Sequence, residues 1–134
     1  MKKIGTLNSH LSTVIASMGH LDKLVICDSG LPIPRHREVV DLALAPNIPG
    51  FLETVGVVLT ELHVERAIIA REMANANKKT FAGLARLLKG IGTRKVSHAE
   101  FKRIAGGNGT IAFVRTGEAS PYANVILISG VTFG

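Results

Sequence analysis

This sequence of 134 residues has a single cysteine, Cys27, and no long apolar run. One cysteine excludes an internal disulfide and is typical of a protein from a reducing compartment. No apolar run approaches the ~18–20 residues that a membrane-spanning helix needs. The N-terminal Met-Lys-Lys-Ile-Gly-Thr has two lysines but no apolar segment behind them, so we do not expect a signal peptide. These absences predict a cytoplasmic protein with no membrane partner.

Aromatic residues are also scarce, at 4% of the sequence with no tryptophan and one tyrosine. The net charge of +6 by itself raises the question of nucleic-acid binding. The scarcity of aromatic residues argues against such binding. Proteins that bind single strands rely on aromatic side chains as stacking platforms. Here the basic residues between Lys78 and Arg103 are interleaved with apolar ones along expected helices and turns. We interpret them as a solvated basic face and expect no nucleic-acid partner.

Recognised cofactor and metal motifs are missing as well. Gly90-Ile91-Gly92 lacks the third glycine of a dinucleotide-binding loop and follows an expected helix instead of a strand. Gly106-Gly107-Asn108-Gly109 has no lysine in register for a phosphate loop. The sequence contains neither the Cys/His spacing of a zinc site nor a G-x-S-x-G nucleophile elbow. We therefore expect no cofactor and no bound metal.

The length fits one domain that spans residues 1–134 and is large enough to bury a core. Hydrophobic residues make up 46% of the sequence, which is generous for so small a chain. A small monomer has little interior in which to bury this excess, so we expect other subunits to cover part of the apolar surface. The composition thus predicts a homo-oligomer.

Apolar periodicity predicts strands that alternate with helices. A helix capped by Asn8-Ser9 carries an apolar stripe from Leu11 to Met18, and Gly19 is suited to the left-handed position that closes it. The segment from Phe51 to Leu62 fits helical spacing better than strand alternation. Further helices are expected over Lys79–Lys89 and from the capping box Ser97-His98-Ala99-Glu100 onward, and strands over Leu24–Asp28, Glu38–Leu44, His63–Ala70, Thr93–Val96, Thr110–Thr116 and Val125–Ser129. This order predicts a Rossmann-like α/β fold, a three-layer α/β/α domain around a mostly parallel, mixed sheet of roughly six strands.

Six polar residues lie at the ends of these elements: His20, Asp28, His98, Lys102, Tyr122 and Asn124. Asp28 ends a buried strand and precedes a stiff loop with two prolines, a position at which open α/β sheets bind ligands. His20 lies just upstream and can transfer a proton near neutral pH. Structural roles are open at this point, since His20 could interact with the C-terminal end of its helix and Asp28 could cap a turn. His98 could be a surface residue in the first turn of its helix, Tyr122 could only pack beside Pro121, and Asn124 could only hold the loop.

Several strings of the sequence resemble the D-ribose pyranase and fucose mutarotase family, and specifically its ribose branch. They follow the family's order from the first residues to the last: Gly5-Thr6-Leu7-Asn8-Ser9, Gly19-His20, Cys27-Asp28-Ser29-Gly30-Leu31-Pro32-Ile33-Pro34, Asp41-Leu42-Ala43-Leu44, His98 with Glu100-Phe101-Lys102, and Gly117-Glu118 with Ser120-Pro121-Tyr122-Ala123-Asn124. The departures are modest. His10 replaces an acidic residue that is common in the family, and Arg35-His36-Arg37 makes the loop after the prolines unusually basic.

The resemblance implies an isomerase that interconverts the pyranose and furanose forms of β-D-ribose, in support of ribose uptake and catabolism. It also implies a three-layer α/β fold and a ring-shaped homo-oligomer, two stacked pentamers, with sites near subunit contacts. By position it implies the catalytic acid–base role for His20 and sugar-binding roles for Asp28, His98, Tyr122 and Asn124, with Lys102 as a weaker candidate. Two other functions stay open: a ribose-binding accessory module without turnover, and a metal-dependent sugar or nucleoside enzyme with His20, Asp28 and His98 as ligands.

Overall fold

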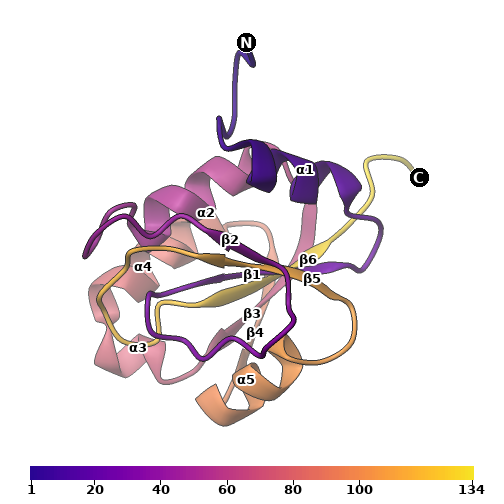
Figure 1. The fold of residues 1–134 in the computed structure, drawn as a ribbon. Helices are drawn as coiled ribbons and strands as arrows, with labels where there is room; N and C mark the ends of the chain where they lie inside the picture. The colour runs from indigo at the N-terminus through magenta and orange to yellow at the C-terminus, as the bar shows by residue number, and fades with distance from the viewer.

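The computed structural model describes residues 1–134 as one six-stranded sheet with helices on both of its faces (Figure 1). The helices are α1 (Ser9–Ser17), α2 (Phe51–Leu59), α3 (Met73–Ala76), α4 (Lys78–Leu87) and α5 (His98–Ala105). The strands are β1 (Lys23–Cys27), β2 (Val39–Asp41), β3 (Val64–Ala70), β4 (Gly92–Val96), β5 (Thr110–Arg115) and β6 (Val125–Ser129). None of the helices has the length and apolar character needed to cross a membrane.

The sheet has the strand order β2-β5-β1-β6-β3-β4, and β6 is the one strand that runs against the others. The two central strands, β1 and β6, read Lys-Leu-Val-Ile-Cys and Val-Ile-Leu-Ile-Ser and are almost entirely buried. Such continuous apolar runs suit strands that are covered on both faces. The edge strand β4 reads Gly-Thr-Arg-Lys-Val, and only its last residue is buried. The hydrophobicity of these three strands thus fits their places in the sheet.

Side chains alternate between the two faces along the central strands. From β1, Leu24 and Ile26 join a core packed beneath α1, α2 and α4, whereas Val25 and Cys27 join the opposite core. That second core is covered by α5 together with Leu31 from the loop after β1. Figure 1 shows α1 and α2 above the sheet and α5 below it. Burial raises the pKa of the Cys27 thiol to about 12, so this cysteine is a packing residue and not a nucleophile.

The predicted fold class is confirmed, because the chain forms three α/β/α layers around a mixed, mostly parallel sheet. The segment that fits helical spacing forms α2 over Phe51–Leu59. The strand predicted over Glu38–Leu44 is shorter, at Val39–Asp41. Its only partner, β5, ends at Arg115, so no further backbone is available for pairing beyond that point. The helix α3 has four residues, which is too few for a periodic apolar pattern to predict it.

Gly19 does not adopt the left-handed conformation that was expected to close α1. The helix ends at Ser17, and the left-handed residue of the following turn is Leu21, with φ of 71°. The Leu21 N–H donates to the carbonyl of Ser129 at the end of β6, at 2.8 Å. A bond to a distant strand therefore shapes this turn, and local helix-closing preferences do not reveal it.

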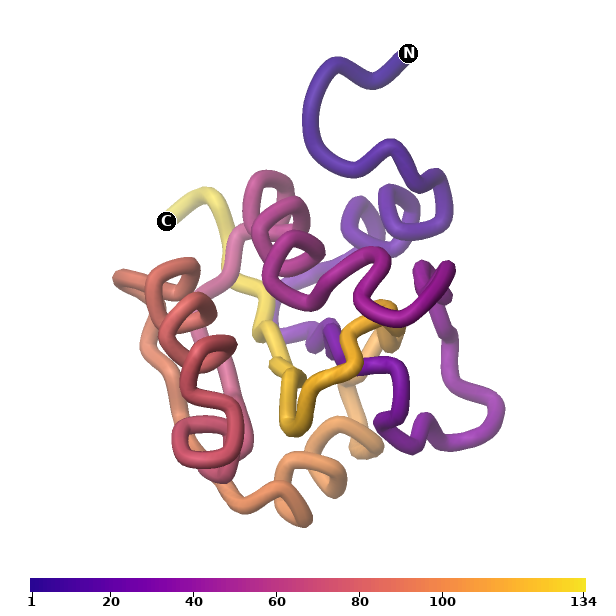
Figure 2. The backbone as a smooth tube through the Cα atoms, turned by 90° about the vertical axis from the view of Figure 1, so that its left-hand side faces the viewer, coloured from indigo at the N-terminus to yellow at the C-terminus, as the bar shows by residue number.

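The N-terminal segment before α1 extends away from the sheet (Figure 2). Glu61, which lies shortly after α2, anchors it, because its carboxylate accepts hydrogen bonds from Lys2 Nζ and from the Thr6 N–H, both at 2.7 Å. Ile4 and Leu7 of this segment remain largely exposed. These side chains are part of the apolar surface that the composition indicates.

We predict that Gly117→Ala destabilises the protein. A Cβ atom at this position would lie 2.5 Å from the Ile48 carbonyl oxygen and equally close to that of Ala45, and backbone atoms cannot move aside easily. We expect the free energy of unfolding to fall by roughly 1–3 kcal/mol, measured by thermal or denaturant unfolding. Gly56→Ala in α2 is the matched control, since its nearest neighbour is the end of the Leu87 side chain at 3.9 Å. An equal loss in both variants would contradict the prediction.

Candidate active site

Asp28 and Asn124 lie side by side at the edge of the sheet where the parallel strands end. Asp28 follows the last residue of β1 and Asn124 precedes the first residue of β6, and these neighbouring strands are antiparallel. The Asp28 N–H donates to Asn124 Oδ1 at 2.9 Å. Asn124 is completely buried, and its Nδ2 has no hydrogen-bond partner in the chain. Because a buried amide without a partner costs free energy, this group is suited to donate to a ligand.

The Asp28 carboxylate has one oxygen with a structural role. Oδ1 accepts a hydrogen bond from the Gly30 N–H at 2.9 Å, which is the turn-capping role that the sequence leaves open. The second oxygen, Oδ2, makes no hydrogen bond within the chain. A structural and a binding role are therefore compatible, since one oxygen shapes the loop and the other can accept a hydroxyl proton.

His98 is the first residue of α5 and follows β4, so it lies at the same edge of the sheet. As the capping box predicts, the Ser97 hydroxyl accepts a hydrogen bond from the Glu100 N–H, at 3.1 Å. The His98 N–H donates to both carboxylate oxygens of Glu72 at 3.0 Å, which fixes the start of the helix. The ring atom Nδ1 is buried and has no partner in the chain. His98 thus adds a second buried polar atom that a ligand can satisfy.

Tyr122 links the histidine to the asparagine. Its ring meets the His98 ring edge-on, with the centroids 5.0 Å apart and an interplanar angle of 79°. Its backbone is left-handed, with φ of 59°, and its carbonyl accepts the Asn124 N–H at 2.9 Å. Left-handed residues other than glycine are uncommon, and this one makes a tight turn just before β6. The turn keeps Tyr122 against His98 while Asn124 contacts Asp28.

Glu118 fixes the loop between β5 and β6. Its Oε1 accepts the Phe51 N–H at the start of α2, at 2.8 Å, and its Oε2 accepts the Ser120 hydroxyl at 2.7 Å. Asn77 Nδ2 donates to the same Ser120 hydroxyl at 2.9 Å. The Glu118 carbonyl also accepts the Ser29 N–H at 3.0 Å, which joins this loop to the loop after β1. The two loops of the cluster are therefore held as one unit.

His20 lies at the opposite edge of the sheet, between α1 and β1. Its Nε2 lies 2.7 Å from Glu65 Oε1 at the start of β3, so the ring bonds to a carboxylate and not to the C-terminal end of α1. Seven residues lie between His20 and Asp28, and five of them form β1, which alone spans about 17 Å at ~3.3 Å per residue. A single copy of the chain therefore does not bring His20 to the cluster formed by Asp28, His98, Tyr122 and Asn124.

Lys102 lies one helical turn after His98, so both residues share a face of α5. Its side chain is exposed and makes no hydrogen bond within the chain. The metal-site interpretation requires His20, Asp28 and His98 around one ion, but His20 lies at the other edge of the sheet. The chain gathers no group of three His, Cys, Asp or Glu side chains able to hold a metal ion.

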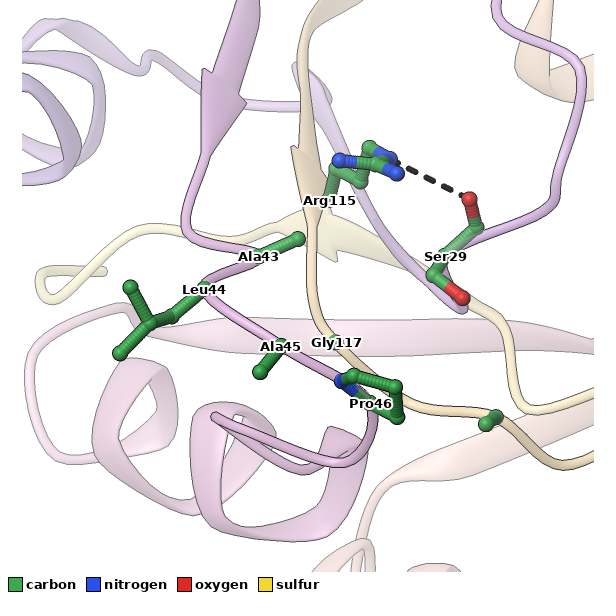
Figure 3. A pocket seen from close by; sticks show the side chains of 8 residues that line it. Ser29, Ala43, Leu44, Ala45, Pro46, Arg115 and Gly117 are labelled. Atoms are coloured by element: carbon green, nitrogen blue, oxygen red, sulfur yellow. Dashed lines mark hydrogen bonds between the residues drawn. The ribbon is translucent and has the colours of Figure 1, made fainter.

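A separate cavity of about 270 Å³ opens beside the loop after β1 (Figure 3). Arg115 contributes to its wall, and its Nε donates to the Ser29 carbonyl at 3.2 Å. The Arg115 Nη1 lies 3.1 Å from both carboxylate oxygens of Asp41. None of the six predicted site residues lines this cavity. Because Ser29 directly follows Asp28, these bonds brace the backbone beside the edge cluster.

Sequence reasoning does not identify three carboxylates that support these residues, namely Glu65, Glu72 and Glu118. Glu65 and Glu72 contact their histidines across 45 and 26 residues of sequence, and apolar periodicity carries no information on such pairs. Glu118 belongs to one of the family-like strings, and this membership is the only signal that could single it out.

The edge cluster combines a carboxylate, an imidazole, a phenol and an amide within a small region. Together these groups offer hydrogen-bond donors and acceptors on several sides, which is what a ligand with many hydroxyl groups requires. Two of the polar atoms are buried without a partner in the chain. The fold and the cluster therefore define an α/β protein with a sheet-edge site suited to a small polyhydroxylated molecule.

The chain belongs to the RbsD / FucU transport protein family, whose model matches residues 1–132. The D-ribose pyranases of Symbiobacterium thermophilum and Coprothermobacter proteolyticus are each 53% identical to it over 133 residues. These matches span 99% of this chain and 100% of each relative. The resemblance to the ribose branch, which the motifs indicate, is confirmed.

Solved structures agree with this assignment. The structure of Bacillus subtilis RbsD complexed with D-ribose has a TM-score of 0.93 and 43% sequence identity, and the match covers 99% of this chain and 100% of that one. The fucose mutarotase from Streptococcus pneumoniae, solved in complex with L-fucose, has a TM-score of 0.82 at 21% identity over 99% of this chain and 100% of that one. The second likeness shows that the fold is shared.

We predict that Glu72→Gln destabilises the protein at neutral pH. The pKa of Glu72 lies below its ordinary value of 4.5, chiefly because the carboxylate accepts the His98 N–H. The ionised side chain at a helix start contributes about 0.3–1 kcal/mol, so thermal unfolding at pH 7 should show a loss of this size. A lowered pKa in the folded state means that this contribution is complete above pH 4.5 and disappears as the pH falls through the folded-state value. A difference between the two proteins that persists at pH 2–3 would contradict the assignment.

Proposed function

We propose that this protein is an isomerase that interconverts the pyranose and furanose forms of β-D-ribose, in support of ribose uptake and catabolism. The observation that carries the proposal is the full-length identity of 53% with proteins named D-ribose pyranase. The ribose complex of Bacillus subtilis RbsD, at 43% identity, supports the same substrate. In this proposal residues 1–134 act as one pyranase domain.

The reaction requires two proton transfers and no change of oxidation state. A base removes the proton of the anomeric hydroxyl, a carbonyl forms at the anomeric carbon, and the bond to the ring oxygen breaks as that oxygen gains a proton. A different hydroxyl then attacks the carbonyl, and the same transfers in reverse close the other ring. One well-positioned histidine can carry both protons, with a contribution of about 10²–10⁴-fold to the rate. In this proposal His20 is that histidine.

The sugar-binding roles go to the edge cluster. Asp28 Oδ2 accepts a sugar hydroxyl, and Asn124 Nδ2 donates to one, since neither atom has a partner in the chain. His98 Nδ1 likewise has no partner and offers a further contact. The Tyr122 hydroxyl supplies an additional donor and acceptor. Lys102, on the same helix face as His98, is the weaker candidate for a contact with an outer hydroxyl.

His20 and the edge cluster meet, in this proposal, between two copies of the chain. They lie at opposite edges of one sheet, so a head-to-tail contact is needed to bring the His20 edge of one copy to the Asp28 edge of the next. Repeated contacts of this kind form a ring when the rotation between neighbouring copies closes. Exposed apolar side chains such as Ile4, Leu7, Leu44 and Ile48 supply surface for such contacts. We propose a homodecamer of two stacked pentameric rings, and a cytoplasmic location that agrees with the single free thiol of Cys27.

The activity is tested by exchange NMR on D-ribose with catalytic amounts of protein. We expect faster exchange between the pyranose and furanose signals, and a loss of about 10²–10⁴-fold with His20→Ala, because the main proton carrier is removed. His10→Ala is the matched control, since His10 also pairs with a carboxylate, that of Glu38 at 2.5 Å, but is not one of the six predicted site residues. Its rate should equal that of the wild type.

Three results would contradict the proposal. Binding of ribose without faster exchange would favour the accessory module. Loss of exchange on treatment with a chelator, restored by a divalent cation, would favour the metal-dependent enzyme. Full activity of a folded, assembled His20→Ala variant would remove the proposed role of His20.

The shared site is tested by mixing two inactive variants. His20→Ala lacks the proton carrier, and Asp28→Asn keeps the bond to Gly30 but loses the charged sugar contact. After joint unfolding and refolding in equal amounts, about a quarter of the contacts should combine an intact His20 edge with an intact Asp28 edge. Exchange NMR should then recover about a quarter of the wild-type rate. No recovery in mixed assemblies would show that each site is built from one copy.

A further inference from the structure

We propose that Glu65 is a positioning residue that holds the proton of His20 on Nε2 and leaves Nδ1 as the atom that exchanges protons with the sugar. The inference rests on the proposed role of His20 and assigns the working atom of that ring. It also gives a function to a carboxylate that the family-like strings do not contain.

The contact between the two side chains determines which ring nitrogen carries hydrogen. His20 Nε2 lies 2.7 Å from Glu65 Oε1. An ionised carboxylate only accepts hydrogen bonds, so the nitrogen that faces it must be the N–H donor. Nε2 therefore keeps its proton in both the neutral and the charged ring. Only Nδ1 is then able to gain and lose a proton during turnover.

Nδ1 has no competing partner in the chain and belongs to a half-exposed side chain. The His20 side chain is half exposed, with 50% of its surface open, and Nδ1 makes no hydrogen bond within the chain. Glu65 is less exposed, at 34%, and projects from the start of β3, which is paired with β6. The carboxylate is thus held by the sheet, while Nδ1 belongs to a half-exposed ring, has no partner in the chain, and can face a second copy in the proposed assembly.

Hydrogen bonds also hold the backbone on both sides of His20. The Gly19 N–H donates to Asp22 Oδ2 at 2.8 Å, which closes a turn around the histidine. Leu21 is left-handed, with φ of 71°, a conformation that a leucine holds only when its surroundings enforce it. Its N–H donates to the Ser129 carbonyl at 2.8 Å. The turn is tied to β6 and the ring to β3, so two neighbouring strands orient one imidazole.

A second histidine–carboxylate pair provides a control within the same chain. His10 Nε2 lies 2.5 Å from Glu38 Oε1, and both side chains are exposed. The chemistry of this pair matches that of His20 and Glu65, but no proposed role in the reaction falls on it. Substitution of Glu38 therefore measures the effect of losing an ordinary surface pair.

The test combines exchange kinetics with ¹⁵N NMR of the histidine rings in the full-length, assembled protein. We expect Glu65→Ala to slow pyranose–furanose exchange about 10- to 100-fold, a part of the ~10²–10⁴-fold that acid–base catalysis contributes. The affinity for ribose should stay unchanged, because in this proposal Glu65 acts on His20 and not on the sugar. Glu65→Gln keeps an acceptor oxygen and should restore part of the rate. Glu38→Ala should leave the rate at the wild-type level.

The ring signals give a readout that does not depend on activity. In the wild type, the neutral His20 ring should carry its proton on Nε2 alone, and in Glu65→Ala both tautomers should contribute. A neutral wild-type ring with its proton on Nδ1, or equal rates for Glu65→Ala and Glu38→Ala, would overturn the inference. If His20→Ala is inactive while Glu65→Ala is fully active, this inference fails and the proposed function stands. If His20→Ala is itself fully active, the role of His20 fails and the inference fails with it.

Discussion

The pairing of β6 against β1 and β3 is the constraint on which both parts of the candidate site depend. Because β6 alone runs in the opposite direction, its start lies at the edge where β1 ends, and its end lies at the edge where β1 begins. The start delivers Asn124 to the backbone of Asp28. The end delivers the Ser129 carbonyl to the turn that presents His20. A parallel strand in the same place would reach neither edge with the required residue.

Carboxylates that accept backbone N–H groups provide the rigidity of the loops. Glu72 holds the first residue of α5, Glu118 holds the first residue of α2, and Glu61 holds the segment before α1. Two of these three contacts lie at helix starts, where the backbone N–H groups lack partners and the helix dipole favours negative charge. Although the chain is basic overall, several of its few acidic residues are thus used to order the segments that carry the polar cluster.

The sequence predicts the layers of the fold well, because burial on both faces requires continuous apolar strands such as Val125–Ser129. Segment ends are less predictable. The limit of β2 depends on where its partner β5 stops, and the left-handed turn at Leu21 depends on a bond to Ser129. Neither contact leaves a local pattern in the sequence.

The residues at the sheet edge are predictable only in part. Asp28 and His98 follow strands, so their edge can be inferred from the parallel order of β1 and β4. The separation between His20 and Asp28 can also be inferred, because the predicted strand Leu24–Asp28 lies between them. The support from Glu65 and Glu72 depends on contacts between distant strands and helices, which spacing alone does not encode.

Because His20 and the edge cluster lie at opposite edges of the sheet, turnover in the proposed arrangement depends on assembly. In the proposed head-to-tail arrangement, an open row of copies always leaves one unused His20 edge and one unused Asp28 edge at its two ends. When the row closes into a ring, these two ends meet and form one more active site without an additional copy of the chain. A population of incomplete arcs would therefore carry less activity per copy than closed rings, and dilution that opens the rings would lower the specific activity before any subunit unfolds.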